Sequence, residues 1–88
     1  MAETQRGHLQ AAQRVYERLM GKSPENTLGW LGLAAVSTRI GDIQEARRAA
    51  LEVLKIDKND PRPLEVLRYI DEMPQAVRDS LTRLYPPR

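Results

Sequence analysis

The chain has 88 residues, of which 41% are hydrophobic and 30% are charged, as expected for one small globular domain and not for a disordered chain. Fourteen basic and twelve acidic side chains leave a formal net charge of +2, which excludes a polyanion-binding tail. The absence of cysteine excludes disulfides, cysteine-based metal sites and thiol catalysis. No apolar run approaches the ~20 residues that cross a bilayer, and residues 1–10 lack a signal-peptide pattern. The compartment is unknown, with the cytoplasm as the default expectation.

Sparse β-branched residues and clear helix boundaries predict an all-α chain. The first three helices are expected near residues 7–21, 27–40 and 42–56. Gly7, Gly41 and the Ser-Pro-Glu-Asn segment 23–26 are the predicted breaks between helices. Asp42 followed by Glu45 fits a helix N-cap with an acidic residue three positions later. Connections this short predict antiparallel neighbouring helices.

Two further helices are expected near residues 61–72 and 75–85. Asp60 before Pro61 is a helix start signal, because proline at the first helical position loses no needed hydrogen bond. Pro74 predicts a break, because it disfavours helical conformation at Met73. The tail from Tyr85 contains two prolines and cannot continue a helix. About five helices are therefore predicted.

The chain repeats itself with a period of 34 residues. This shift aligns seven pairs of mostly apolar or small residues: Gly7 with Gly41, Leu9 with Ile43, Gln10 with Gln44, Ala12 with Ala46, Arg14 with Arg48, Leu19 with Val53 and Met20 with Leu54. A second shift sets Trp30 over Leu64 and Leu33 over Leu67. Such a series is expected when each unit buries the same face against its neighbour.

The repeat resembles the tetratricopeptide repeat family, whose 34-residue unit is a helix–turn–helix. Trp30, Leu33 and Ala34 have the spacing of the family's first helix, and Ala46 takes the small position where the two helices cross. The resemblance implies an antiparallel helix-hairpin solenoid, with Trp30 buried between units. It divides the single domain 1–88 into the second helix of a partial repeat (1–26), a complete repeat (27–60) and a degenerate or capping repeat (61–88).

Some positions depart from the family pattern. Ser37 and Ala50 stand where aromatic residues are usual, and Lys58 replaces the closing proline. In the last unit Arg68 occupies a position that is normally small, and Asp71 one that is normally aromatic. The last unit therefore resembles a polar terminal cap more than an interior repeat.

The residues for catalysis or cofactor binding are not present in a recognisable arrangement. His8 is the only histidine, and its expected role is solvent-facing or capping. No serine sits in a glycine-flanked elbow, and the five glycines form no phosphate-binding loop. Gly29 and Gly32 flank Trp30 and are better explained by close helix packing. We therefore predict no enzyme activity, no catalytic or metal-binding residue and no cofactor.

Nucleic acid and membranes are also disfavoured as partners. Basic and acidic residues alternate along the predicted second helices: Arg14, Arg18, Arg47 and Arg48 with Glu17, Glu45 and Glu52. Such mixing favours a solvated, salt-bridged surface over a phosphate-binding track. No exposed aromatic run could stack bases, and no helix combines a broad apolar face with a solid basic one.

The family resemblance implies that another protein is the partner, bound as a peptide or amphipathic helix in a concave groove, in an adaptor or scaffold role. The predicted groove residues lie on two first helices: Leu28, Leu31, Ala35, Thr38, Arg39, Arg62, Glu65, Tyr69 and Glu72. Tyr69 is the preferred contact, because an exposed aromatic supplies large contact area at low entropic cost. Arg39 and Arg62 are expected to be free to meet an acidic residue. Alternatively, Leu28 and Leu31 merely cover the core or contact a neighbouring repeat that is absent from this chain.

The clamp with which some family members bind a chaperone's C-terminal carboxylate is not supported. At the matching positions of the central unit stand Leu28, Leu31, Gly32 and Ala35, none of which is basic or carries an amide side chain.

Two other functional readings stay open. The first unit has only its second helix, so Leu9, Ala12, Tyr16 and Leu19 would lack part of their usual cover. Either the chain is a fragment of a longer array, or these residues form a homo-oligomer face. A third reading is an accessory domain that positions other parts of a larger protein.

Overall fold

The computed structural model describes residues 3–84 of the chain. Within that range it contains helices and no strand. The helices are α1 (Glu3–Lys22), α2 (Thr27–Ile40), α3 (Ile43–Ile56), α4 (Arg62–Glu72) and α5 (Gln75–Leu84). The prediction of an all-α fold with five helices is confirmed.

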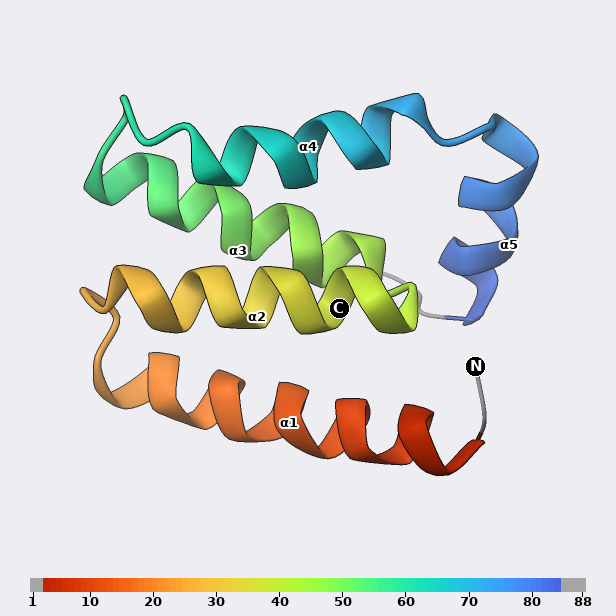
Figure 1. The fold of residues 1–88 in the computed structure, drawn as a ribbon, viewed down its shortest axis with the longest axis horizontal. Coiled ribbons are helices and arrows are strands. Elements are labelled where there is room, and N and C mark those ends of the chain that lie inside the picture. Colours follow the sequence, from red (N-terminus) through yellow and green to blue (C-terminus); the bar gives the residue numbers. More distant parts are fainter. Residues whose placement is uncertain (1–2, 85–88) are drawn as a thin grey trace.

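The first four helices lie side by side, and each runs antiparallel to the helix before it (Figure 1). α2 packs against both α1 and α3, whereas α4 packs on α3 and also contacts α2. α2 and α4 run in the same direction (Figure 1). Their C-terminal ends lie on the same side of the molecule, which positions the site described below.

The ends of α2 and the start of α3 are set by the local signals that the sequence carries. The Asn26 side chain accepts a hydrogen bond from the Gly29 N–H (3.1 Å), which caps the first turn of α2. Gly41 ends α2 in the left-handed region (φ 89°), a conformation that glycine adopts without steric cost. Asp42 then caps α3 by accepting from the Glu45 N–H (3.3 Å), as predicted.

Predicted boundaries differ from the structure in three helices: α1 starts earlier and ends one residue later, and α3 and α4 each begin one residue later than expected. Gly7 lies inside α1, which begins at Glu3, so Gly7 is not a break. One interior glycine costs a helix only about 1 kcal/mol relative to alanine, which neighbouring turns can offset. α4 begins at Arg62, one residue later than expected, and the Asp60 carboxylate accepts from the Arg62 N–H (3.0 Å). The predicted end of the last helix at residue 85 and the tail after it lie outside the described residues.

The core forms two buried clusters around the central hairpin. The larger cluster joins the last turn of α1 to α2 and α3: Met20, Trp30, Leu33, Ala34, Ala49 and Val53. The smaller one joins α3 to α4: Ile43, Ala46 and Ile70. Trp30 is buried as predicted, its ring N–H donates to the Pro24 carbonyl (2.7 Å), and the Arg48 guanidinium lies over the ring at 5.3 Å.

The glycines beside Trp30 mark close contact between α1 and α2, as predicted. A Cβ on Gly29 would overlap the terminal carbon of Met20. A Cβ on Gly32 would lie 2.6 Å from the ring of Tyr16. The two α1 side chains therefore fill the space that the missing Cβ atoms leave.

α5 departs from the predicted antiparallel arrangement. It turns across the end of α3 instead of running back along α4 (Figure 1). Extended backbone at Met73 (ψ 137°), followed by Pro74, breaks the helix and redirects the chain. α5 has no fully buried residue, and Leu81 is its partly buried contact with the smaller core cluster. Because α5 has so little apolar surface to bury, it packs across one end of the bundle and does not cover the length of a neighbouring helix.

Candidate functional site

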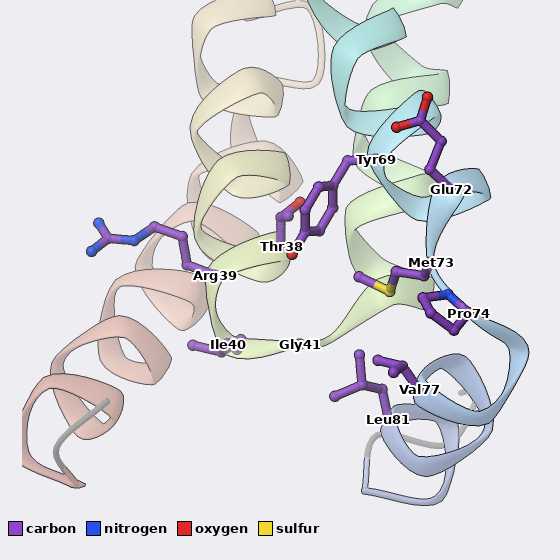
Figure 2. Close-up of a pocket in the computed structure, with 10 residues that line it drawn as sticks. All are labelled: Thr38, Arg39, Ile40, Gly41, Tyr69, Glu72, Met73, Pro74, Val77 and Leu81. Carbon is purple, nitrogen blue, oxygen red and sulfur yellow. The ribbon is translucent and has the colours of Figure 1, made fainter.

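A pocket of about 560 Å³ lies where the C-terminal ends of α2 and α4 meet α5. Its lining comes from three segments, as Figure 2 shows. Thr38, Arg39 and Ile40 end α2 and Gly41 follows them, Tyr69 and Glu72 lie on α4 with Met73 and Pro74 in the connection after it, and Val77 and Leu81 lie on α5. The pocket forms because α5 crosses the end of the bundle near the turn between α2 and α3 and does not run back along α4.

The apolar wall of the pocket depends on Gly41. A Cβ at that position would lie 2.7 Å from Cδ2 of Leu81, so glycine lets α5 approach the turn between α2 and α3. Val77 and Leu81 extend from α5 toward that turn, and Met73 points into the space between α2 and α4 (Figure 2). The methionine thioether is flexible and polarisable, which suits a surface that adapts to a ligand.

Tyr69 forms the aromatic wall. Its ring leans from α4 toward Thr38 of α2 (Figure 2), and 54% of the residue is exposed. The Thr38 hydroxyl donates to the Ala34 carbonyl of its own helix (2.7 Å). The Thr38 proton is therefore already used, whereas the exposed Tyr69 offers a ligand both its apolar ring and its phenolic hydroxyl.

Two opposite charges stand at the rim. Arg39 and Glu72 are both exposed, and their side chains point away from the pocket centre (Figure 2). Neither forms an ion pair with another residue in the range 7–84. The site therefore combines an apolar interior with one cation and one anion at its edge.

Four of the nine predicted groove residues line this pocket: Thr38, Arg39, Tyr69 and Glu72. Leu28, Ala35 and Glu65 are exposed but are not part of its lining. Leu31 is only partly exposed and packs against the larger core cluster, as the alternative interpretation of Leu31 expects.

Arg62 is not free to meet a partner's acid, contrary to expectation. Its guanidinium donates to both carboxylate oxygens of Asp60, at 3.0 Å from Nε to Oδ1 and 2.7 Å from Nη2 to Oδ2. This hydrogen bonding lowers the pKa of Asp60 and raises that of Arg62. The pair fixes the start of α4, at the end of the helix away from the pocket.

The α1 residues predicted as an oligomer face are not equally exposed to solvent. The Tyr16 ring turns inward against Gly32, and Leu9 and Ala12 are half-buried. Leu19 is 37% exposed, and Val15, which the sequence reasoning missed, is 55% exposed. Leu19 is therefore the member of the predicted set that lies, with Val15, on the most open apolar side of α1.

Comparison with known protein families decides what kind of repeat this is. The sequence model described as tetratricopeptide repeat matches residues 3–68, three quarters of the chain. The chain belongs to the tetratricopeptide repeat family. Searches of curated proteins and of solved structures found no significant match to it.

The tetratricopeptide match ends at residue 68, inside α4. The pocket residues that come from α4, from α5 and from the connection between them all follow that point. Residues from Tyr69 onward, which supply one apolar wall, follow the matched segment. Tetratricopeptide repeats generally mediate protein–protein interactions and are not themselves catalytic. The part of this pocket built by α5 is thus a feature of this chain beyond the matched repeat.

Metal and membrane sites were also sought in this tetratricopeptide domain. No group of three or more His, Cys, Asp or Glu side chains within residues 3–84 could hold a metal ion. Over the same residues, no helix has the length and apolar character needed to span a bilayer. His8 is exposed on α1.

Proposed function

We propose that this tetratricopeptide domain binds a segment of a partner protein in the pocket between α2, α4 and α5, in an adaptor or scaffold role. The observation that carries the proposal is the exposed Tyr69 beside an apolar pocket. A volume of about 560 Å³ suits one or two anchoring side chains, since small-ligand sites usually fall in the range of about 300–1,000 Å³.

The lining defines the chemistry of the segment. Met73, Val77 and Leu81 favour an apolar or aromatic anchor, which Tyr69 would contact edge-on or by stacking. Arg39 and Glu72 at the rim would set the direction of the segment through opposite charges on either side of the anchor. Rim charges of this kind affect association rate and register more than affinity.

A carboxylate-terminated peptide is not the favoured ligand. Arg39 is the one cation of the lining, and its side chain points away from the pocket (Figure 2). Binding a terminal carboxylate would require several donors directed at one point. We therefore favour an internal segment with an apolar anchor.

Affinity selection with displayed short peptides, followed by titration of purified variants, tests this proposal. We expect Tyr69→Ala to weaken the selected peptide by about tenfold or more, as for an interface hot spot. Leu28→Ala is the matched control, because Leu28 is 71% exposed at the opposite end of α2 and should leave affinity unchanged. Circular dichroism of both variants checks that the helices persist. Equal affinity for wild type and Tyr69→Ala would contradict the proposal.

A further inference from the structure

The outer side of α1 carries apolar side chains that no helix in the range 3–84 covers. Val15 is 55% exposed and Leu19 37% exposed. A shallow hollow of about 500 Å³ lies over the same side, lined by Ala11, Arg14, Val15, Glu17 and Arg18. It is separate from the pocket between α2, α4 and α5.

The internal repeat shows what this side of a second helix packs against. Thirty-four residues after Val15 and Leu19 stand Ala49 and Val53 of α3. Both are fully buried in the cluster that contains Trp30 of α2. The positions that are exposed on α1 are therefore buried at the equivalent places on α3. The helix that buries them there is α2, which carries Trp30.

The charged residues of α1 and α3 can be compared in the same way, at positions 34 residues apart. Arg14 corresponds to Arg48, whose guanidinium lies over the Trp30 ring and is held by the Glu45 carboxylate (2.8 Å from Nε). Ala11 stands at the position of Glu45, so α1 lacks that carboxylate. Arg14 is exposed and forms no ion pair or side-chain hydrogen bond with the side chains that the structure describes, those of residues 7 to 84.

We propose that this side of α1 binds an amphipathic helix of a partner protein, seated as α2 is seated on α3. The partner helix carries an aromatic residue under Arg14, apolar or small residues over Val15 and Leu19, and an acidic residue near Arg14 or Arg18. Two arginines against the single acid Glu17 favour an acidic partner. The same arginines disfavour a second copy of α1 on this surface.

A peptide spanning residues 24–42 is the probe, because it contains Trp30 in its native helical sequence. We expect its titration into isotope-labelled protein to shift the NMR signals of Ala11, Val15 and Leu19. A Trp30→Ala peptide should bind about tenfold more weakly or worse. Val15→Glu or Arg14→Glu in the protein should abolish the shifts, whereas Leu51→Glu, an exposed site on α3, should not.

Three results would overturn the proposal. One is no binding of the peptide to wild type. Another is a set of shifts centred on Ala49 and Val53, which would mean that the peptide displaces α2. The third is a concentration-dependent dimer without peptide that Val15→Glu disrupts, which would assign the surface to a second copy. None of these results bears on Tyr69, so the pocket proposal is tested separately.

Discussion

The Gln13 side chain of α1 donates a hydrogen bond to the Asp42 carboxylate (2.9 Å), the N-cap of α3, across 29 residues of sequence. The same amide nitrogen donates to the Ser37 hydroxyl of α2 (3.1 Å). All three side chains are buried. At position 37, where the family usually has an aromatic residue, the buried serine supplies the hydroxyl that accepts this hydrogen bond. One amide therefore links three helices.

Gln13→Ala should destabilise the fold, because it leaves the buried Asp42 carboxylate and Ser37 hydroxyl without this donor. We expect the free energy of unfolding to fall by about 1–3 kcal/mol. Urea denaturation at neutral pH measures the change. Gln75→Ala is the control, because its hydrogen bond to Asp79 is exposed, and its effect should stay within about 0.5 kcal/mol. Equal effects of the two substitutions would contradict a structural role for the network.

Trp30→Ala should cost about 3–5 kcal/mol, because it removes the largest side chain of the main core cluster. Thermal and chemical denaturation measure this loss, which could unfold a domain whose total stability is about 5–15 kcal/mol. Trp30→Phe keeps a ring beneath Arg48 but loses the hydrogen bond to the Pro24 carbonyl, so its cost should be smaller. An unchanged melting curve for Trp30→Ala would show that the repeat register is wrong.

Gly41→Ala and Gly21→Ala should change the stability of the fold in opposite directions. At Gly41 the positive φ strains any L-residue by about 1–2 kcal/mol, and the added Cβ would also push Leu81 away. At Gly21, inside α1, a Cβ meets nothing within 4 Å, so alanine should stabilise the helix by up to about 1 kcal/mol. Melting temperatures compare the two variants. Stabilisation by Gly41→Ala would contradict the packing of α5 on this turn.

The Asp60–Arg62 pair should make stability sensitive to acid. Hydrogen bonds from Arg62 lower the pKa of Asp60 in the folded state. The unfolded chain therefore binds the proton first, and the stabilisation is present above the ordinary aspartate pKa of about 4 and lost as the pH falls below it. Denaturation at neutral pH and near pH 3 should show a smaller loss for Arg62→Gln than for wild type. Identical losses would contradict this link.

Local signals in the sequence predicted where the helices begin and end better than they predicted how the helices pack. The bounds of α2 match the expected 27–40, because Asn26 and Gly41 each have a capping role that depends only on nearby residues. Gly7 gave a false break, because one glycine without a cap or proline beside it does not stop a helix. The direction of α5 depends on Leu81 meeting Gly41, forty residues away, which no local pattern encodes.

Four of the ten residues that line the candidate site were predicted from the sequence. Helical register brought Tyr69 and Glu72 together with Thr38, since α2 and α4 run in the same direction. Met73, Val77 and Leu81 were missed, because their place in the pocket follows from the crossing of α5. The pairing of Arg62 with Asp60 was a signal available in the sequence, two residues apart, but Asp60 was considered only as a cap.

Mapping of the peptide-binding surface by NMR tests the central proposal most directly. A peptide selected on the wild-type domain would be titrated into isotope-labelled protein. We expect the largest shifts at Gly41, Met73 and Leu81, and their loss in Tyr69→Ala. Shifts confined to the opposite ends of α2 and α4, at Leu28 and Leu64, would contradict binding in this pocket.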